Sequence, residues 1–432
     1  ILKERKVGVF ASINIIQGDD MKKLDKNMLQ GISAKYGESF YLLDVEQFRK
    51  NFMELRGEFQ KLYPKSNIAY SYKTNYIPTL CRIVNEMGGY AETVSDMECE
   101  IALKVGVRPE HIAFNGPYKD KAAVESMLLK GAHINVDSLY EMKFIESIVR
   151  KHPDRNFKIG VRCNFDIEDG VLSRFGFDVD GQEFLDALDI VHRTENLFLK
   201  GMHSHFASRS IETWSTRTRK MLDVVQKYCD GIPEYICQGG GIYGKMDDSL
   251  KAQFDNYIPT YKEYAEVVCP LYAERFGKLP IEAQPELFIE PGSALVGDCM
   301  KFVTKVVSIK NIRKKNIATL KGSIYNINPT LNKKNPPISV CHMYENEPMP
   351  YKDLDFGGFT CIESDYLYRH FDGQLAVGDY VIFGNVGSYS IVLKPPFILP
   401  NFAVVELSEN AEEKCVKRQE EFEDLFHTFC FD

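Results

Sequence analysis

Short apolar segments alternate with longer amphipathic segments over the first two thirds of the chain. The short segments are apolar and partly β-branched, which predicts strands. Eight are expected, at residues 67–73, 88–95, 111–117, 133–138, 158–164, 199–206, 234–241 and 287–292. The longer segments carry apolar residues at helical spacing, which predicts helices at residues 45–63, 77–87, 97–105, 121–129, 139–152, 184–192, 211–229 and 257–276. This alternation predicts an α/β fold, a (β/α)8 barrel in which helices cover a closed parallel sheet.

The pattern changes at about Met300, after which strands follow one another without intervening helices. They are expected at residues 301–309, 316–324, 337–343, 379–385 and 402–407, with a charged helix near 411–429 closing the chain. The early apolar segment VGVFASINI has no place in the barrel. We therefore expect residues 1–40 and residues 299–432 to form one β-domain, and residues 41–298 to form the barrel.

Composition narrows the class of protein. The 432 residues suffice for two domains, and 44% hydrophobic with 26% charged residues excludes a disordered chain. The net charge of −8 argues against nucleic acid as a partner. The eleven cysteines form no C-x-x-C pair, which indicates reduced thiols. With no apolar run long enough to span a bilayer and no signal-like segment, we expect a cytoplasmic protein and no membrane partner.

Reactive side chains gather where the predicted barrel strands end. In a (β/α)8 barrel these ends form the face that carries the active site. The residues concerned are Lys73, Glu92, Ser95, His203, His205, Ser208, the run Gly239-Gly240-Gly241 and the run Glu290-Pro291-Gly292.

Each of these features alone has an explanation without chemistry. Lys73 could be a surface lysine, the three glycines a tight turn, and Glu290 a solvated loop acid. His203 and His205 could face opposite sides of a strand, and without a third clustered ligand we expect no metal.

Together on one rim, these features match the needs of pyridoxal 5'-phosphate (PLP). A lysine binds this cofactor covalently, and glycine N–H groups can hold its phosphate. An imidazole can stack on its ring, and a carboxylate can keep its ring nitrogen protonated. The sequence therefore predicts a PLP site on the barrel rim.

The motifs strengthen this interpretation, because the chain resembles the fold type III (alanine-racemase-like) PLP enzymes on the branch of diaminopimelate and ornithine decarboxylases. The resemblance extends from residue 36 to residue 405. The matching segments, in order, are YSYKTN (70–75), YAETVSDMECE (90–100), INVDS (134–138), VRCN…SRFG (161–176), HSHFAS (203–208), QGGGIYG (238–244), EPG (290–292), TCIESDYL (360–367) and GSYS (387–390).

The resemblance implies a role for each matching residue. Cofactor binding is implied for Lys73, Glu92, Arg162, His205, Ser208, Gly239, Gly240, Gly241, Glu290, Gly292 and Tyr389. Catalytic roles are implied for Lys73, His205, Glu290 and Cys361, the last as a proton donor. Relatives of this kind are homodimers in which the cysteine segment reaches the partner's barrel, so we expect Arg174 to pair with Asp365 of the other subunit.

Several departures from the family pattern concern the substrate. Ser293 stands where the family has an arginine after Glu-Pro-Gly, and Arg209 replaces the usual glutamine or glycine. Lys333 stands approximately where ornithine decarboxylases carry an aspartate, and Glu363 lies one position beyond the usual acidic neighbour of the cysteine. Arg209, Lys333 and Glu363 are therefore candidate substrate-binding residues, and we expect an amino acid other than ornithine. Lys333 could equally be a solvated loop residue, and Arg209 could bind the phosphate in place of the arginine that Ser293 replaces.

Two other functions remain open at this point. An amino-acid racemase of the same fold is one, although such racemases place an arginine at the ring nitrogen. A catalytically inactive regulatory homologue is the other, although such relatives lose cofactor-binding residues that this chain retains.

Overall fold

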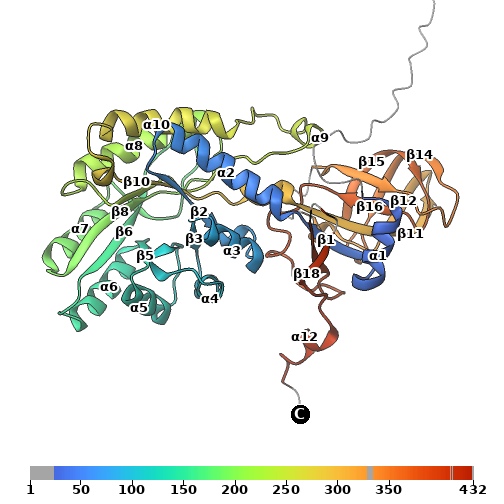
Figure 1. The fold of residues 1–432 in the computed structure, drawn as a ribbon, viewed down its shortest axis with the longest axis horizontal. Helices are drawn as coiled ribbons and strands as arrows, with labels where there is room; N and C mark the ends of the chain where they lie inside the picture. Colours follow the sequence, from blue (N-terminus) through green and yellow to red (C-terminus); the bar gives the residue numbers. More distant parts are fainter. Residues whose placement is uncertain (1–23, 328–333, 409, 411, 431–432) are drawn as a thin grey trace, which may run out of the picture.

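The computed structural model describes residues 24–327, 334–408, 410 and 412–430. Two sheets lie side by side (Figure 1), the barrel at the left and a β-domain at the right of the view. None of the helices described is long and apolar enough to cross a membrane.

Eight parallel strands form the barrel, in the order β2-β3-β4-β5-β6-β8-β9-β10, and it closes between β10 and β2. Their bounds are β2 Ser66–Ser71, β3 Tyr90–Thr93, β4 Ile112–Phe114, β5 His133–Val136, β6 Phe157–Asn164, β8 Leu197–His203, β9 Tyr235–Cys237 and β10 Glu286–Ile289, with β7 (Phe177–Asp178) beside β6. The predicted (β/α)8 barrel is confirmed, and each of its strands overlaps the segment in which it was expected.

Helices surround the barrel (Figure 1), and the longer ones contribute buried apolar side chains to its core. They are α2 Val45–Leu62, α3 Pro78–Glu86, α4 Asp96–Lys104, α5 Lys121–Lys130, α6 Leu139–Lys151, α7 Gln182–Arg193, α8 Ile211–Tyr228 and α10 Tyr261–Phe276, with the short α9 (Asp248–Lys251) and α11 (Ser293–Val296). Polar side chains cap many of these helices at their first turn, which explains where they begin. Ser95, for example, accepts a hydrogen bond from the Glu98 N–H, so it serves as a cap.

Aromatic side chains pack inside the barrel, and two of them come from the first residues of strands β3 and β9. Tyr235, Phe288 and Tyr90 pack there around His133. Gly201 leaves the space that the Tyr235 ring occupies, since a Cβ at Gly201 would overlap that ring. This part of the interior is thus a closely packed core.

The β-domain draws on both ends of the described chain. Its sheet runs β15-β14-β12-β11-β1-β17-β18, with β16 joining β11 to β13. The bounds are β1 Ser39–Leu43, β11 Met300–Ile312, β12 Lys315–Leu320, β13 Ile338–Cys341, β14 Met349–Gly357, β15 Tyr366–Leu375, β16 Tyr380–Phe383, β17 Ala403–Leu407 and β18 Glu413–Lys417, with helices α1 Lys26–Tyr36 and α12 Phe422–Phe426. Because β1 pairs with both β11 and β17, the N-terminal part belongs to this domain as far as Leu43, beyond the expected boundary at residue 40. The segment VGVFASINI lies outside the described residues.

The β-domain also differs from expectation in two places. The sequence pattern missed β14 and β15, whose faces alternate irregularly because bulges shift their register. The closing helix predicted at 411–429 is wrong: Glu413–Lys417 forms strand β18 against β17, and only Phe422–Phe426 is helical. Pairing with an available sheet edge overrides the helix preference of this charged segment.

The β-domain contacts the barrel rim through the loop after β16. The Tyr389 N–H donates to the Thr74 carbonyl (2.9 Å), and Asn75 Nδ2 donates to the Gly387 carbonyl (3.0 Å). Thr74 and Asn75 directly follow Lys73, so this contact fixes the segment on which the lysine lies.

Stability of the barrel should depend on the glycine beside Tyr235. Gly201→Ala forces a methyl group into the space of that buried ring, and we expect destabilisation by about 1–3 kcal/mol. Gly57→Ala is the control, because its Cβ meets nothing within 4 Å on helix α2 and should stabilise by about 0.5–1 kcal/mol. The melting temperature of the full chain should therefore fall in the first variant and rise in the second. A Gly201→Ala protein as stable as wild type would contradict this account of the barrel interior.

Candidate active site

Six polar side chains converge at the C-terminal end of the barrel. They come from several different strands or the turns that follow them, and they are Lys73, Glu92, Asn115, His203, His205 and Glu290. The parallel arrangement of the strands brings all their carboxyl ends to this rim.

Lys73 lies in a single 3-10 turn, Tyr72–Thr74, directly after β2. Its Nζ donates to Ser71 Oγ (2.7 Å) and to the carboxylate of Glu92, which is buried on β3. Burial lowers the pKa of Lys73, but the Glu92 and Glu290 carboxylates outweigh that effect and raise it above its ordinary value. Lys73 is thus a cationic amine with a proton acceptor in contact, which differs from a solvated surface lysine.

Glu290 follows β10 and is almost completely buried. His203 Nε2 lies 3.1 Å from its Oε1, and Asn115 Nδ2 donates to the same oxygen at 2.7 Å. Burial opposes the charge of the carboxylate, but the imidazole of His203 holds the pKa of Glu290 well below its ordinary value. Glu290 is therefore an anion inside the protein, not a solvated loop acid.

Asn115 connects the two carboxylates of the site. Its Nδ2 donates both to Glu92 Oε1 (3.1 Å) and to Glu290 Oε1, while Asn135 Nδ2 donates to its Oδ1 (2.8 Å). Sequence reasoning missed this residue. Its position as the first polar residue after strand β4 was the signal that could have identified it.

The imidazole of His205 is neutral. The Gly240 N–H donates to its Nδ1 at 3.1 Å, so this nitrogen carries no hydrogen. Burial lowers the pKa of His205, which agrees with an uncharged ring. The Nδ1 atom also lies 3.4 Å from Glu290 Oε2, so the ring lies directly beside the buried carboxylate.

Gly239, Gly240 and Gly241 form a turn that other residues could not adopt. Gly239 (φ +69°) and Gly241 (φ +88°) have left-handed backbones. A Cβ at Gly240 would lie 2.7 Å from the Glu290 carbonyl oxygen, and one at Gly241 would lie 2.7 Å from the Ser208 carbonyl oxygen. The run is thus a tight turn, and it is pressed against the residues of the site.

Other residues named from the sequence lie around this cluster. Ser208 Oγ accepts a hydrogen bond from Thr213 Oγ1 (3.0 Å) just before α8. Gly292 packs against Thr74, and Tyr389 reaches the rim from the β-domain. Arg209 stacks its guanidinium on Tyr243, 5.1 Å from the ring centre.

Arg162 and the β-domain residues have other surroundings. Arg162, buried on β6, donates to Asp137 (3.1 Å) and is thus half of a buried ion pair. Cys361 and Glu363 are exposed on the β-domain. Lys333 lies outside the described residues.

We expected no metal because the sequence offered no third ligand beside the two histidines, but the structure does bring further candidate ligands together. His203 does have candidate ligands nearby, because Cys237 and Glu290 offer donor atoms within 4.8 Å of it and of one another. Sequence reasoning missed Cys237, which lies on the neighbouring strand β9. Burial raises the pKa of the Cys237 thiol well above its ordinary value, so it carries a proton at neutral pH, whereas a thiolate is the metal-binding form.

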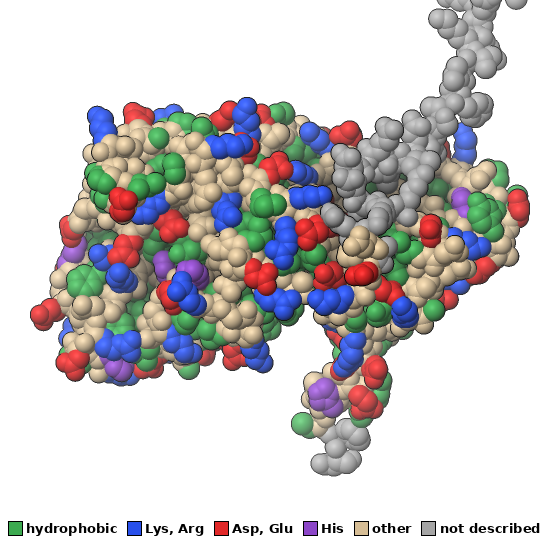
Figure 2. All heavy atoms as spheres, in the orientation of Figure 1, with side chains coloured by type: hydrophobic (Ala, Val, Ile, Leu, Met, Phe, Trp, Pro, Cys, Tyr) green, Lys and Arg blue, Asp and Glu red, His purple; other side chains and the backbone are tan. Residues whose placement is uncertain are grey.

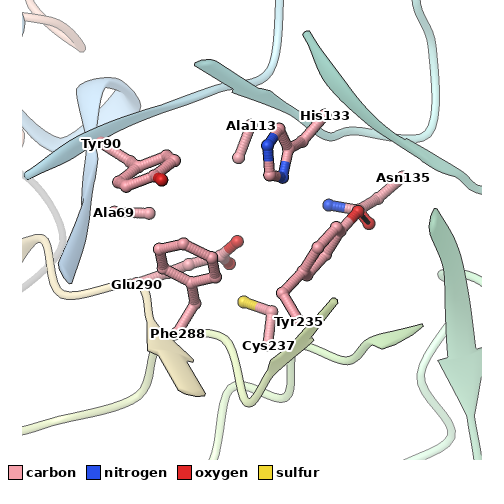
Figure 3. A pocket seen from close by; sticks show the side chains of 9 residues that line it. All are labelled: Ala69, Tyr90, Ala113, His133, Asn135, Tyr235, Cys237, Phe288 and Glu290. Carbon is pink, nitrogen blue, oxygen red and sulfur yellow. Dashed lines mark hydrogen bonds between the residues drawn. The ribbon is translucent and has the colours of Figure 1, made fainter. Parts of the chain in front are cut away.

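A small internal cavity lies beneath the cluster (Figure 3). Glu290 and Cys237 point into it, and Tyr235, Phe288 and His133 line it. Its volume of about 10 Å³ is enough for roughly one water molecule. The cavity is therefore too small to hold a cofactor.

The residues of the rim fit PLP. The glycine turn packs so closely against the site that a Cβ would clash with neighbouring carbonyl oxygens, and a lysine amine, a neutral imidazole and a buried anionic carboxylate lie beside it. This set of groups on a (β/α)8 barrel defines a PLP-dependent enzyme of the barrel-plus-β-domain class.

Comparison with known proteins identifies the family. Residues 49–297, more than half of the chain, match the family model described as the pyridoxal-binding domain of pyridoxal-dependent decarboxylases. This chain belongs to that family and is a PLP-dependent amino-acid decarboxylase.

Individual relatives agree with this assignment. The chain is 24% identical over 355 residues to the diaminopimelate decarboxylase of Archaeoglobus fulgidus, covering 78% of this chain and 81% of the relative. It is 22% identical over 418 residues to that of Aquifex aeolicus, covering 91% and 93%. The solved structure of the M. jannaschii diaminopimelate decarboxylase has the same fold, with a TM-score of 0.81, 22% identity and coverage of 93% and 94%.

The contact between Lys73 and Glu92 yields a prediction about pH. Removing the Glu92 charge in Glu92→Gln leaves burial as the larger influence, so the apparent pKa of Lys73 should fall. The pH profile for PLP capture by the cofactor-free protein, followed by visible absorbance, should therefore shift to lower pH. Glu110→Gln, at an exposed carboxylate, is the matched control. An unchanged profile in Glu92→Gln would mean that Glu92 does not set the charge of Lys73.

Proposed function

We propose that Lys73, Glu92, His205 and Glu290 are the catalytic centre of this decarboxylase and that its substrate has an acidic or neutral polar far end. The supporting observation is the pairing of an anionic, buried Glu290 with an amine, Lys73, on the same rim.

Each side chain has a separate task. Bound PLP supplies the electron sink that decarboxylation requires. The Lys73 amine must lose a proton to bind PLP covalently, and the Glu92 carboxylate in contact with it accepts that proton. Glu290 holds a proton on the ring nitrogen of PLP, while His203 and Asn115 keep its carboxylate in place. The uncharged His205 ring can stack on the cofactor without adding a competing cation.

This arrangement disfavours the two alternative functions. A racemase of this fold would have an arginine at the ring nitrogen, whereas here the carboxylate of Glu290 lies at the rim. An inactive regulatory homologue would have lost this cluster. Visible absorbance that appears with PLP and disappears in Lys73→Ala, together with release of carbon dioxide from an amino acid, tests the function directly.

We also propose a homodimer with shared sites. Tyr389 lies on the rim of its own barrel, whereas Cys361, in the segment before Asp365, is exposed on the β-domain, where a second subunit can reach it. Cys361 would then donate a proton in the partner's site. The pair expected between Arg174 and Asp365 is not favoured, because Asp365 is buried and accepts hydrogen bonds from Ser323, Ile324 and Thr360 within its own domain.

Mixing two inactive variants tests the shared site. If Cys361 serves the partner's barrel, Lys73→Ala subunits mixed with Cys361→Ala subunits should regain up to about a quarter of wild-type activity, since one of four site combinations is intact. Each variant alone supplies the background. If verified subunit exchange restores nothing, both residues act within one chain.

The rim also suggests the charge of the substrate. Arg209 presents a cation there, and Ser293 does not supply a second one. A cation repels a distal ammonium and forms a charge-assisted hydrogen bond with a carboxylate or phosphate. The sequence position of Lys333 supports the same preference. Ornithine, lysine and arginine are therefore expected to be poor substrates.

A comparison of acidic with basic amino acids tests this preference. In wild type, kcat/KM should be higher for acidic or neutral polar amino acids than for ornithine, lysine or arginine. In Arg209→Gln this ratio should fall by about tenfold or more, because the variant no longer offers a charge to the substrate. Arg219→Gln, at an exposed position on helix α8, should leave the ratio unchanged. A wild-type enzyme that prefers ornithine or lysine would overturn the proposal.

A further inference from the structure

A buried arginine without a carboxylate partner among the described residues lies directly beneath the glycine turn. Arg217 projects from helix α8 and is fully buried. Its Nη2 donates to the Gly240 carbonyl (2.9 Å), and its guanidinium stacks on Trp214, 3.1 Å from the ring centre. Its Nε and Nη1 atoms have no hydrogen-bond partner in the part of the chain that the structure describes.

The guanidinium keeps its charge in this position. Burial lowers the pKa of Arg217 to about 9, which still leaves it protonated at neutral pH. No described carboxylate forms an ion pair with it, and the anion Glu290 is already bonded to His203 and Asn115. A buried charge without a partner is strongly unfavourable, so its position next to the turn points to an anion that is not part of the chain.

The turn offers free N–H groups for such an anion. Arg217 binds the Gly240 carbonyl, and Trp214 Nε1 donates to the Gly241 carbonyl (2.9 Å). In a trans peptide the C=O and N–H groups point in opposite directions, so both contacts turn the next N–H away from helix α8. Those two N–H groups belong to Gly241 and Ile242, and neither donates to another described residue.

We propose that Arg217 is the positioning residue and counter-charge of the cofactor phosphate, in place of the arginine that this chain lacks at Ser293. Its positive charge lies at the carbonyl end of the peptide between Gly240 and Gly241, and it polarises that peptide so that the Gly241 N–H binds a phosphate more strongly. The proposal rests on the proposed function, since it requires PLP as the ligand.

Arg209 is the other cation that could compensate for Ser293. It is partly exposed, and its guanidinium lies on Tyr243 instead of bonding to the turn. Arg217 contacts the turn directly, so the two arginines have separable tasks: Arg217 acts on the phosphate, and Arg209 acts on the substrate.

Comparing PLP with pyridoxal, which lacks the phosphate, tests this division. Dissociation constants of both ligands are measured on the full-length chain after removal of cofactor, by visible absorbance. In Arg217→Gln, which keeps a polar amide but removes the charge, PLP affinity should fall by about tenfold or more. Pyridoxal affinity should change less than about twofold. Arg219→Gln and Arg209→Gln should leave the affinity for PLP unchanged.

Each outcome is decisive. Parallel losses of PLP and pyridoxal affinity in Arg217→Gln, or no loss at all, would overturn the assignment. Wild-type protein that binds neither ligand would instead contradict the proposed function itself. If Arg217→Gln fails to fold, Arg217→Lys, which retains the charge, is measured together with phosphate protection of the wild type. Inorganic phosphate should then raise the melting temperature of the cofactor-free wild type, and the absence of any such effect would reject the proposal.

Discussion

The site depends on one buried charge. Glu290 is an anion at the end of β10, where burial alone would neutralise it, and His203 and Asn115 compensate by bonding to one of its oxygens. Asn115 also donates a hydrogen bond to Glu92, and Glu92 accepts one from Lys73, so the position of Glu290 restricts the positions of both residues. The positions of the amine and of the carboxylate are thus coupled by hydrogen bonds across strands β2, β3, β4 and β10. Closure of the barrel is what brings these strands together.

The site has a second buried charge, Arg217, whose surroundings differ from those of Glu290. Glu290 has partners within the chain, whereas Arg217 has none among the described carboxylates and is held by a carbonyl and an indole ring. The glycine turn lies between the two, in contact with His205 on one side and Arg217 on the other. The glycine turn, which has left-handed backbone conformations, therefore lies between the Glu290 carboxylate and the Arg217 guanidinium. In the proposed arrangement, the anion holds the proton on the ring nitrogen of the cofactor and the cation acts on its phosphate.

The β-domain contributes to the site in two ways: it holds the backbone that follows Lys73, and it carries the exposed Cys361. Its loop at Gly387–Tyr389 bonds to the residues directly after Lys73. Cys361 lies on an exposed part of the same domain. On the face shown in Figure 2, Lys and Arg side chains are interspersed with Asp and Glu, so no single sign of charge dominates it.

The sequence by itself determined the barrel and most of the rim. Strand and helix periods are local properties, and the rule that barrel chemistry lies at strand ends then selected Lys73, Glu92, His205, the glycines and Glu290 before any distance was known. Asn115 could have been named from its position at the end of a strand, but its bonds to Glu92 and Glu290 could not. The sequence could not identify Cys237 or Arg217, because their importance comes from residues far away in the chain that closure of the sheet brings beside them. The sequence pattern did not predict strands β14 and β15, because bulges disrupt the alternation of their side chains. It predicted a helix where strand β18 lies, because only the pairing with β17 makes that segment a strand. Only the tertiary structure decided which charges are paired and which are left for a ligand, because burial and partnership arise when distant elements pack together.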